Sequence, residues 1–465
     1  MRRLPLLFLV LAACGDDSAR KIADAPEGPH DSPPLIDTPP QALPVLVTAV
    51  LPDGTPIPGA KVYFQNADSS VAGATALDAS GNARQVMNAG GYATVLAPNV
   101  LVGGFGGGMQ YTVTTWAGVK PGDHLIFSLP GGGGAPTQAT ITIPLDTAHS
   151  AAITKYIIES TCGQTDVQLP SGSGATNAST TFYFASDCSA ADMFVVGVDA
   201  SSQPVSSFFV PAQPVTANEV IDYTAQTYAA AGTRTYTFDN VTGGLAIEVA
   251  DNLATGRGQL YTGTGASTTI SDPATLTAPY PAQAAGSLDV ILASQQAGTT
   301  SRRLAEWGTT GAYTQDWAAH LLPDFATGPS LDTGTHVLSW TTSGGALTPD
   351  FAEASVLVHR GAMTWSWRIV APSATQIAFP NLPTDVADLN IAATDTYNFS
   401  SNVVHIAKVP GGYDAARGSL FVANSPVFTG ATGTAEANTY QQLLGVAAKH
   451  DAAKRDVMRR WIRPR

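Results

Sequence analysis

The chain has 465 residues and a formal charge of −13, from 36 acidic and 23 basic side chains. This acidic balance argues against a nucleic-acid binder, because neutralising phosphates needs clustered Lys and Arg. Only 13% of the residues are charged, where about 25% is usual, and 44% are apolar. That apolar content is enough to bury the cores of about two to four domains of ordinary size, and it excludes disorder throughout.

The first thirteen residues have the pattern of an export signal. Arg2 and Arg3 form a positive region, residues 4–11 an apolar run, and Ala12 and Ala13 a small-residue cleavage region. The apolar run of eight residues is too short to cross a bilayer core, which needs about 20. The sequence therefore predicts a signal peptide over residues 1–13.

Cys14 follows this signal directly and completes the four residues Leu-Ala-Ala-Cys. This run resembles the lipobox of bacterial lipoproteins. The resemblance implies cleavage before Cys14, a diacylglyceryl group on its sulfur and attachment to the membrane through the acyl chains. Gly15 stands where an Asp would resemble the inner-membrane retention signal, so the resemblance favours the outer membrane. An ordinary secretory signal with a chance cysteine, or a short membrane helix, is the alternative.

Residues 14–43 form the predicted linker. They are rich in Pro, Asp and small polar residues and contain few apolar ones. Pro-rich chain favours extended polyproline II at about 3.1 Å per residue. We therefore expect a disordered spacer that holds the first folded domain several tens of ångströms from the membrane.

Residues 44–146 alternate short β-prone runs with turn signals. Val45–Val50 and residues 60–64 are typical strands, and Asp-Gly, Pro-Gly and Ser-Gly pairs separate such runs. The stretch 51–62, followed by 77–83, resembles the turns of carboxypeptidase-regulatory-like and bacterial Ig-like domains. The resemblance implies an Ig-like or prealbumin-like β-sandwich, a fold that serves in those families as spacer, stalk or sugar-binding accessory.

The local chemistry of the two motifs explains their residues. Gly54 and Gly81 permit the positive φ of tight turns, and Asp53 and Asp78 can bond the backbone two residues further on. Nothing in these turns is catalytic.

Residues 147–230 predict a second β-sandwich, and residues 231–435 a further β-rich region of one or two modules. Cys162 and Cys188 are the two cysteines after Cys14. An even pair in an oxidising compartment, without a CxxC or Cys/His cluster, predicts a disulfide, and two buried free thiols are the alternative. Two Pro-containing segments about a hundred residues apart, 277–281 and 378–383, hint at a repeated module.

Residues 436–465 differ from the rest of the chain. They are rich in Ala, Leu, Lys and Arg, and from Lys449 onward they carry a local charge of +5. This composition predicts a basic helical tail. We expect it to face water, and contact with anionic lipid is the alternative.

The sequence contains no catalytic or metal-binding signature such as GxSxG, HExxH or an EF-hand loop. We therefore expect no cofactor and no metal. His336 and His359 lie in predicted strands and could converge across a sheet, although the bland interpretation as ordinary polar or core histidines is stronger. The carboxylates that could in principle form a hydrolytic pair, with no spacing that brings two of them together, are Glu306, Asp316, Asp324, Asp350 and Glu353.

Three tryptophans in neighbouring predicted strands are weak candidates for stacking against sugar rings: Trp340, Trp365 and Trp367. The period-2 alternation around Trp365 and Trp367 favours a core position instead.

These observations predict an all-β protein: tandem β-sandwich modules, Ig-like or prealbumin-like, after a disordered Pro-rich linker, with a short C-terminal helix. The function expected is that of a lipid-anchored protein of the outer membrane that acts by binding or by structure. The expected partners are the membrane, through the anchor, and an envelope glycan or a surface protein. A surface or periplasmic hydrolase with catalytic residues from distant loops is the alternative.

Overall fold

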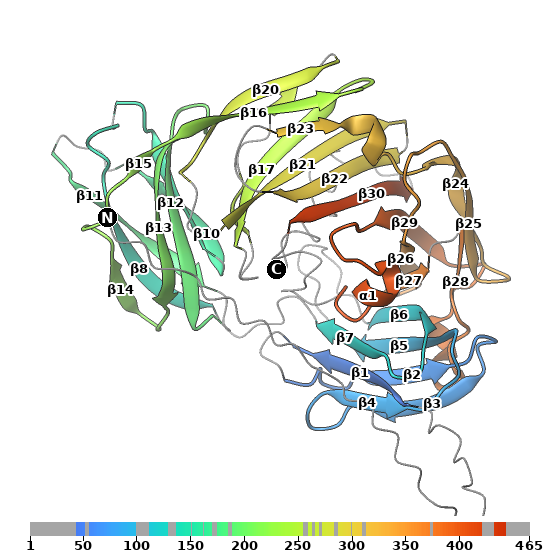
Figure 1. The fold of residues 1–465 in the computed structure, drawn as a ribbon. Coiled ribbons are helices and arrows are strands. Elements are labelled where there is room, and N and C mark those ends of the chain that lie inside the picture. Colours follow the sequence, from blue (N-terminus) through green and yellow to red (C-terminus); the bar gives the residue numbers. More distant parts are fainter. Residues whose placement is uncertain are drawn as a thin grey trace, which may run out of the picture. The chain divides into compact units, whose positions relative to one another are not determined.

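The chain is mostly β and folds into several sheets (Figure 1), which confirms that part of the predicted fold class. The computed structural model describes residues 43–51, 55–98, 111–128, 136–149, 151–160, 162–169, 174–184, 188–253, 259–262, 266–268, 272–282, 287–298, 300–308, 313–372, 375–420 and 432–442. The signal peptide, Cys14, the Pro-rich linker and most of the basic tail lie outside the described residues.

Strand set 1 consists of the first seven strands and forms two sheets. Its strands are β1 (Val45–Val50), β2 (Lys61–Gln65), β3 (Val71–Ala76), β4 (Asn82–Gln85), β5 (Gly91–Pro98), β6 (Tyr111–Val119) and β7 (His124–Ser128). One sheet has the order β4-β1-β7, and the other begins β3-β2-β5-β6. β1 alternates buried and half-buried residues, and its buried face packs into one cluster with β2 and β5. The two sheets therefore share a core.

The turn before β4 shows the predicted chemistry. The Asp78 carboxylate accepts hydrogen bonds from the backbone N–H of Ser80 at 2.8 Å and of Asn82 at 2.9 Å. Gly81 has φ of +76°, which a side chain would strain. Asp53 and Gly54 of the first motif lie outside the described residues.

The same strand order recurs twice along the chain. Strand set 2 consists of β8 (Thr137–Pro144), β9 (Lys155–Ser160), β10 (Gly163–Gln168), β11 (Asn177–Phe184), β12 (Ala190–Val198), β13 (Pro204–Pro214), β14 (Glu219–Asp222) and β15 (Ala229–Ala230). Strand set 3 consists of β16 (Gly232–Asp239), β17 (Leu245–Leu253), β18 (Gln259–Thr262), β19 (Ala266–Thr268), β20 (Ala274–Tyr280), β21 (Ser287–Ala297), β22 (Thr300–Gly308) and β23 (Tyr313–Asp316), followed by the 3-10 helix η1 (Trp317–His320).

The short strands β15 and β19 are left out of the count that follows. In sets 1, 2 and 3 the first strand pairs antiparallel with the fourth strand and parallel with the seventh. The opposite sheet runs third, second, fifth, sixth. Three stretches of different sequence therefore adopt one topology.

Strand set 4 has the same strand order with one strand moved. It consists of β24 (Asp324–Asp332), β25 (Val337–Ser343), β26 (Phe351–Arg360), β27 (Met363–Pro372), β28 (Gln376–Ala378), β29 (Thr396–His405) and β30 (Gly433–Gln442), with the 3-10 helix η2 (Thr384–Leu389) and the short helix α1 (Gly412–Ala416). Its sheets have the orders β24-β25-β28 and β30-β29-β26-β27. In the sheet, β24 lies where the seventh strand lies in sets 1 to 3. In the sequence, however, it precedes β25, which holds the place of the first strand, and it is antiparallel to β25.

Three of the sets join edge to edge into one 13-stranded sheet. β22 of set 3 pairs antiparallel with β30 of set 4, and β27 of set 4 pairs parallel with β6 of set 1. β6 and β27 lie side by side in Figure 1, although some 250 residues separate them in the sequence. Set 4 thus uses both edges of its larger sheet to hold its neighbours.

The part of the long sheet contributed by set 4 is covered on both faces. On one face β25 and β28 enclose a cluster that contains Trp365 and Trp367. On the other face Tyr413 and Ala416 of α1 join a cluster that continues into set 1. Burial on both faces explains why the first four residues of β26, 351–354, are all buried before the strand begins to alternate.

The strand pairing bears on the predicted domain limits. The predicted limit at residue 146 falls after β8, yet β8 pairs with β11 and β14 of set 2. Residues 231–435, for which one or two modules were expected, hold strand set 3 and most of strand set 4. The Pro-containing segments 277–281 and 378–383 coincide with or directly follow β20 and β28, which hold the same place in sets 3 and 4.

The predicted C-terminal helix is wrong where the structure describes it. Residues 438–442 belong to β30, whose backbone pairs with β22 on one side and β29 on the other. Pairing on both edges gives these residues a strand conformation, and the helix-favouring composition on which the prediction depended lies further along the tail. The remaining residues of that tail, 443–465, lie outside the described residues.

Candidate functional site

Where the structure describes them, the site residues predicted from the sequence are buried in the core or make structural contacts. Cys162 and Cys188 form the predicted disulfide, which ties the turn between β9 and β10 to the segment before β12. Trp365 and Trp367 are fully buried and Trp340 is 4% exposed. None of the three indole rings presents a free face on which a sugar could stack, and Trp367 donates a hydrogen bond to Thr115 at 3.0 Å.

The five candidate carboxylates are not brought together as a pair. Glu353 accepts a two-pronged contact from Arg368 at 2.7 and 3.0 Å, and Asp324 accepts a similar contact from Arg302. Asp316 caps η1 by accepting from the backbone N–H of Ala318.

Asp350 and the two candidate histidines also have local partners. The Asp350 carboxylate accepts from the backbone N–H of Ile406 at 2.7 Å. His359 contacts Thr364 at 3.0 Å, and His336 precedes β25 in a different sheet. Among the described residues no group of three or more His, Cys, Asp or Glu side chains could hold a metal ion.

A group of titratable and polar side chains lies where β22 meets β30, and we call it the joint cluster. It consists of Glu306, Tyr313, Gln315, His320 and Glu436. Tyr313 and Gln315 both donate to the Glu306 carboxylate, and the Gln315 oxygen lies 3.2 Å from His320 Nε2. His320 Nδ1 lies 2.9 Å from Glu436 Oε1. The cluster thus forms a chain of contacts between two carboxylates.

Burial sets the electrostatics of the joint cluster. Glu436 is 1% exposed, and its Oε2 has no hydrogen-bond partner among the described residues. The hydrogen bond to Glu436 raises the pKa of His320 above its ordinary value, and burial raises the pKa of Tyr313. A carboxylate, an imidazole with a raised pKa and a second carboxylate can hold and move a proton.

Sequence reasoning missed most of this cluster. Glu436 and His320 are 116 residues apart, and β30 was expected to be helical at its C-terminal end. Glu306 was considered, but only as a member of an unpaired set. No local spacing could have joined these side chains, because the pairing of β22 with β30 brings them together.

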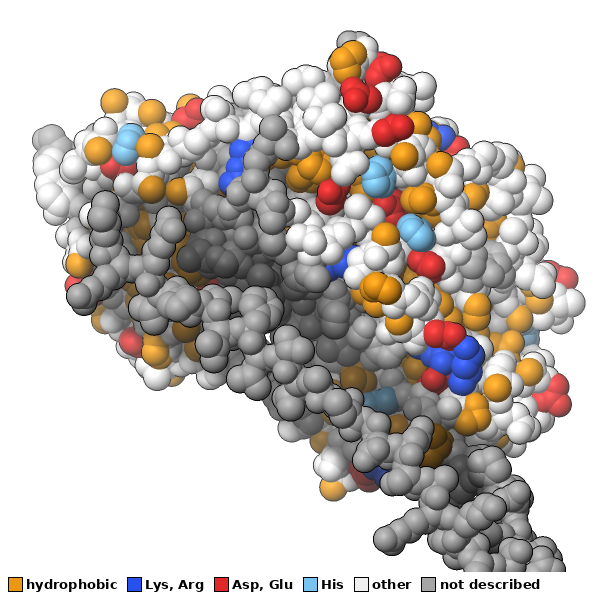
Figure 2. All heavy atoms as spheres, viewed as in Figure 1, with side chains coloured by type: hydrophobic (Ala, Val, Ile, Leu, Met, Phe, Trp, Pro, Cys, Tyr) orange, Lys and Arg blue, Asp and Glu red, His pale blue; other side chains and the backbone are white. Residues whose placement is uncertain are grey.

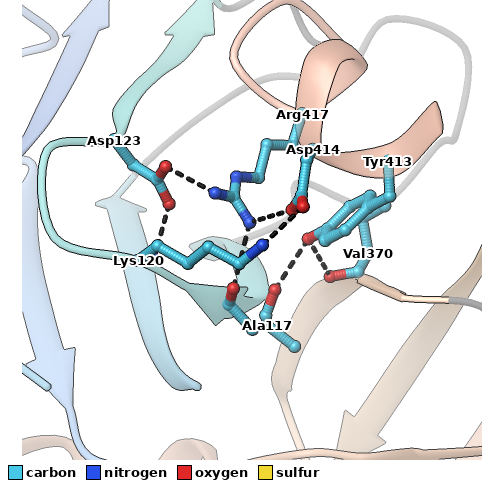
Figure 3. A network of polar contacts seen from close by, with 8 residues as sticks. Ala117, Lys120, Asp123, Val370, Tyr413, Asp414 and Arg417 are labelled. Carbon is cyan, nitrogen blue, oxygen red and sulfur yellow. Dashed lines mark hydrogen bonds and ion pairs between the residues drawn. The ribbon is translucent and has the colours of Figure 1, made fainter. Parts of the chain in front are cut away.

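A second polar network fastens α1 to the turn between β6 and β7 (Figure 3). The Arg417 side chain is 5% exposed and donates to Asp123, to Asp414 at 2.9 Å and to the carbonyl of Gly118 at 3.0 Å. The Tyr413 hydroxyl lies 2.8 Å from the carbonyl of Ala117 and 3.0 Å from that of Val370. Burial raises the pKa of this hydroxyl, which therefore stays protonated.

Beside this network lies an open depression of about 550 Å³, lined in part by Lys120, Asp350 and Asp414. Lys120 pairs with Asp414 across it. Because its charged groups already pair with one another or with backbone, the depression offers no unpaired group to a ligand.

Lys408 occupies an unusual environment near the joint between β22 and β30. Its side chain is almost completely buried, its Nζ lies 3.8 Å from the centre of the Trp307 ring, and this nitrogen has no hydrogen-bond partner among the described residues. Burial lowers its pKa to about 7. An amine in this state is partly uncharged at neutral pH.

The outer faces of the four three-stranded sheets share one feature, and we call them the hydroxyl faces. Each carries a cross-strand polar pair between its first strand and a neighbour, at 2.6 to 2.9 Å: Thr48 with Asn82, Thr142 with Ser179, Thr235 with Thr277, and Thr341 with Thr327. On set 2 this face also presents Tyr183, 57% exposed, and Val220, 68% exposed. Charged side chains are few among the described residues on the face drawn in Figure 2, and a group of Lys or Arg with Asp or Glu beside it lies at the right of the view.

Comparison with known proteins gives little. No family model matches the chain, and no curated protein does. Among solved structures, the Bacillus anthracis TIE protein is similar at 11% sequence identity and a TM-score of 0.14, over 59% of this chain and 49% of that one. The chain thus spans about half the length of that structure, and a likeness at this TM-score supports no conclusion about fold or function.

In the part of the chain that the structure describes, no helix has the length and apolar character needed to span a membrane.

Proposed function

We propose that this protein is a lipid-anchored protein of the outer membrane, built of tandem Ig-like or prealbumin-like β-sandwich modules, that acts by binding or as a structural element. The observation that carries the proposal is the repetition of one two-sheet strand order in four sets. Repeated β units joined at their edges extend a surface, which suits contact with a large partner. The lipobox resemblance at Cys14 implies the membrane anchor, and the predicted linker would hold the folded part away from the membrane surface.

The hydroxyl faces support an envelope glycan as the partner. Rows of Thr and Ser hydroxyls offer donors and acceptors to sugar hydroxyls, and Tyr183 offers a ring for stacking. Charged residues such as Arg84 and Asp222 are few in the strands of these faces, which favours a neutral ligand over a strongly acidic or basic protein.

The anchor is tested by the intact mass of the membrane-extracted protein beside a Cys14→Ala variant, together with protease shaving of whole cells. The proposal expects loss of residues 1–13, added acyl mass on the unmutated protein and digestion from outside. An unmodified Cys14, or a protein protected from the protease, would contradict surface tethering.

Binding is tested separately by pull-down with purified envelope polysaccharide. Tyr183→Ala should weaken retention, while Val86→Ala, at an exposed residue away from this face, should not. Equal retention of both variants would remove the hydroxyl face of set 2 from the proposal.

A hydrolase is the second candidate, and the joint cluster is the observation that favours it. A His with a raised pKa between two carboxylates has the groups that general acid–base catalysis uses. A screen of glycoside and ester substrates tests it, with Glu436→Gln as the variant that should abolish any turnover found. Turnover that survives this substitution would place the chemistry elsewhere.

A further inference from the structure

The long sheet ends at a strand that lacks the usual protection of a sheet edge. β3 is the terminal strand of the 13-stranded sheet, and among the described residues it pairs only with β2. Its sequence, Val-Ala-Gly-Ala-Thr-Ala, contains no charged residue and no proline. Natural proteins generally blunt exposed edges with Lys, Pro or bulges, because free N–H and C=O groups template pairing with another chain.

A bulge affects only the beginning of β3. The register with β2 shifts between Phe64 and Gln65, where Val71 lies, and residues 73–76 pair regularly. Ala74 is exposed, and the side chains beside it are small. The Gln85 side chain of β4 lies against Gly73, which is half-buried, so the exposed position at which a second strand can approach the outer edge is Ala74.

The molecule already uses such edges to join its own strand sets. β22 and β30 hold the same sixth place in sets 3 and 4, and they pair antiparallel, as two identical edges would in a symmetric dimer. β6 and β27 form the second joint. Within the long sheet, both joints bury edges that would otherwise resemble that of β3.

We propose that β3 pairs antiparallel with β3 of a second copy of this chain, so that the long sheet continues from one molecule into the next. With a two-fold axis perpendicular to the sheet, the same face of the sheet points the same way in both molecules. Residues directly opposite each other must then have side chains on the same face, so their residue numbers sum to an even value. With the axis at Ala74, each Ala74 lies opposite its counterpart, and Gly73 lies opposite Thr75. This inference goes beyond the proposed function and does not depend on lipidation or on a glycan.

Sedimentation velocity of the detergent-extracted full chain over a range of concentrations is the first test. The unmutated protein should show a concentration-dependent dimer. Ala74→Lys should shift it to monomer, because like charges then meet on the axis. The matched control is Leu169→Lys, which adds the same charge at an exposed residue next to β10, in a different sheet, and should leave the dimer intact.

Charge pairing makes the test specific to position 74. Ala74→Glu alone should also be monomeric, and an equal mixture of the Lys and Glu variants should recover the dimer. Circular dichroism of each variant checks that the fold is retained. A mixture that stays monomeric although both variants are folded would overturn the symmetric register.

Cysteine cross-linking provides a test that does not rely on a disruptive charge. Opposite Cβ atoms in an antiparallel pair lie about 4.5–5.5 Å apart, within reach of a disulfide after small adjustments. Ala74→Cys should give a covalent dimer on mild oxidation, and Leu169→Cys, at an exposed residue outside the long sheet, should not. A strictly monomeric unmutated chain at all concentrations, or equal cross-linking of both cysteine variants, would refute the proposal.

Discussion

Lys408 carries an amine that the fold removes from water without giving it a hydrogen-bond partner among the described residues. The ring of Trp307 faces the ammonium, at 3.8 Å. An ion–ring contact offsets only part of the cost of burying a charge. The fold therefore favours the uncharged amine, whereas the unfolded chain keeps it protonated to about pH 10.5.

Stability should consequently rise with pH between about 7 and about 10.5. The folded pKa lies below the unfolded one, so in this window the unfolded chain binds more protons, and the contribution has a slope of up to about 1.4 kcal/mol per pH unit. Lys408→Met should remove this rise and stabilise the protein at pH 7. Urea unfolding at pH 7, 8.5 and 10 measures it, and parallel pH profiles of the two proteins would contradict the prediction.

His320 should act with the opposite sign. Its folded pKa is raised by Glu436, so the stabilisation is fully present below the unfolded pKa of about 6.5 and is lost as pH rises through the folded value. The difference in unfolding free energy between the unmutated protein and His320→Gln should therefore shrink from pH 5.5 to pH 8.5. A difference that is constant with pH would mean that the imidazole has the same pKa in the folded and the unfolded chain.

At the scale of elements, the short helix α1 depends on side chains rather than on its own hydrogen bonds. It has five residues, too few for an isolated helix in water. Arg417 and Tyr413 hold it to the end of β6 and to β27. The helix in turn covers one face of set 4 and joins its core to that of set 1.

Arg417→Met should cost about 3 kcal/mol of unfolding free energy, because it leaves Asp123, 15% exposed, without its buried partner. Lys120→Met removes a member of the same network whose ion pair is about half exposed, and it should cost less than about 1 kcal/mol. Chemical denaturation of both variants makes the comparison. Equal losses would show that the buried guanidinium does not fasten α1.

At the scale of the whole molecule, the strand sets differ in what holds them. Sets 1, 3 and 4 share one sheet, whereas the two sheets of set 2 are separate from it and contain the disulfide. Closing a loop of this length stabilises a fold by about 3–4 kcal/mol on the chain-entropy model. Loss of that link should therefore act mainly on set 2.

Reduction of the disulfide should speed amide hydrogen exchange in β9 to β13 and leave β26 to β29 unchanged. The double variant Cys162→Ala/Cys188→Ala should reproduce this pattern without a reductant. Exchange followed by mass spectrometry resolves the two regions. Faster exchange spread evenly over the chain would show that set 2 unfolds together with the long sheet.

Local sequence predicted most strands where alternation was strong. The runs at β1 and β2 were recognised from their β-branched and aromatic residues, and the Asp78 turn from its Asp and Gly. The predicted disulfide followed from cysteine number and compartment. Each of these features depends on neighbours in the chain or on composition, which a single sequence contains.

Pairing between distant strands could not be predicted in the same way. The small uncharged residues of β3 and the mostly small and polar residues of β30 have weak β signals, and only their neighbours make them strands. The joint cluster and the environment of Lys408 arise at the same inter-set joint.

The sequence by itself determined a β-rich chain with a disulfide, because alternation, turn residues and cysteine number act locally. The export and lipidation signals are equally local, although they stay predictions here. The tertiary structure alone decided that four sets share one strand order and that three of them merge into a single sheet. The physical reason is that backbone hydrogen bonds at a strand edge are the same for every sequence, so side-chain patterns do not record which edge will meet which.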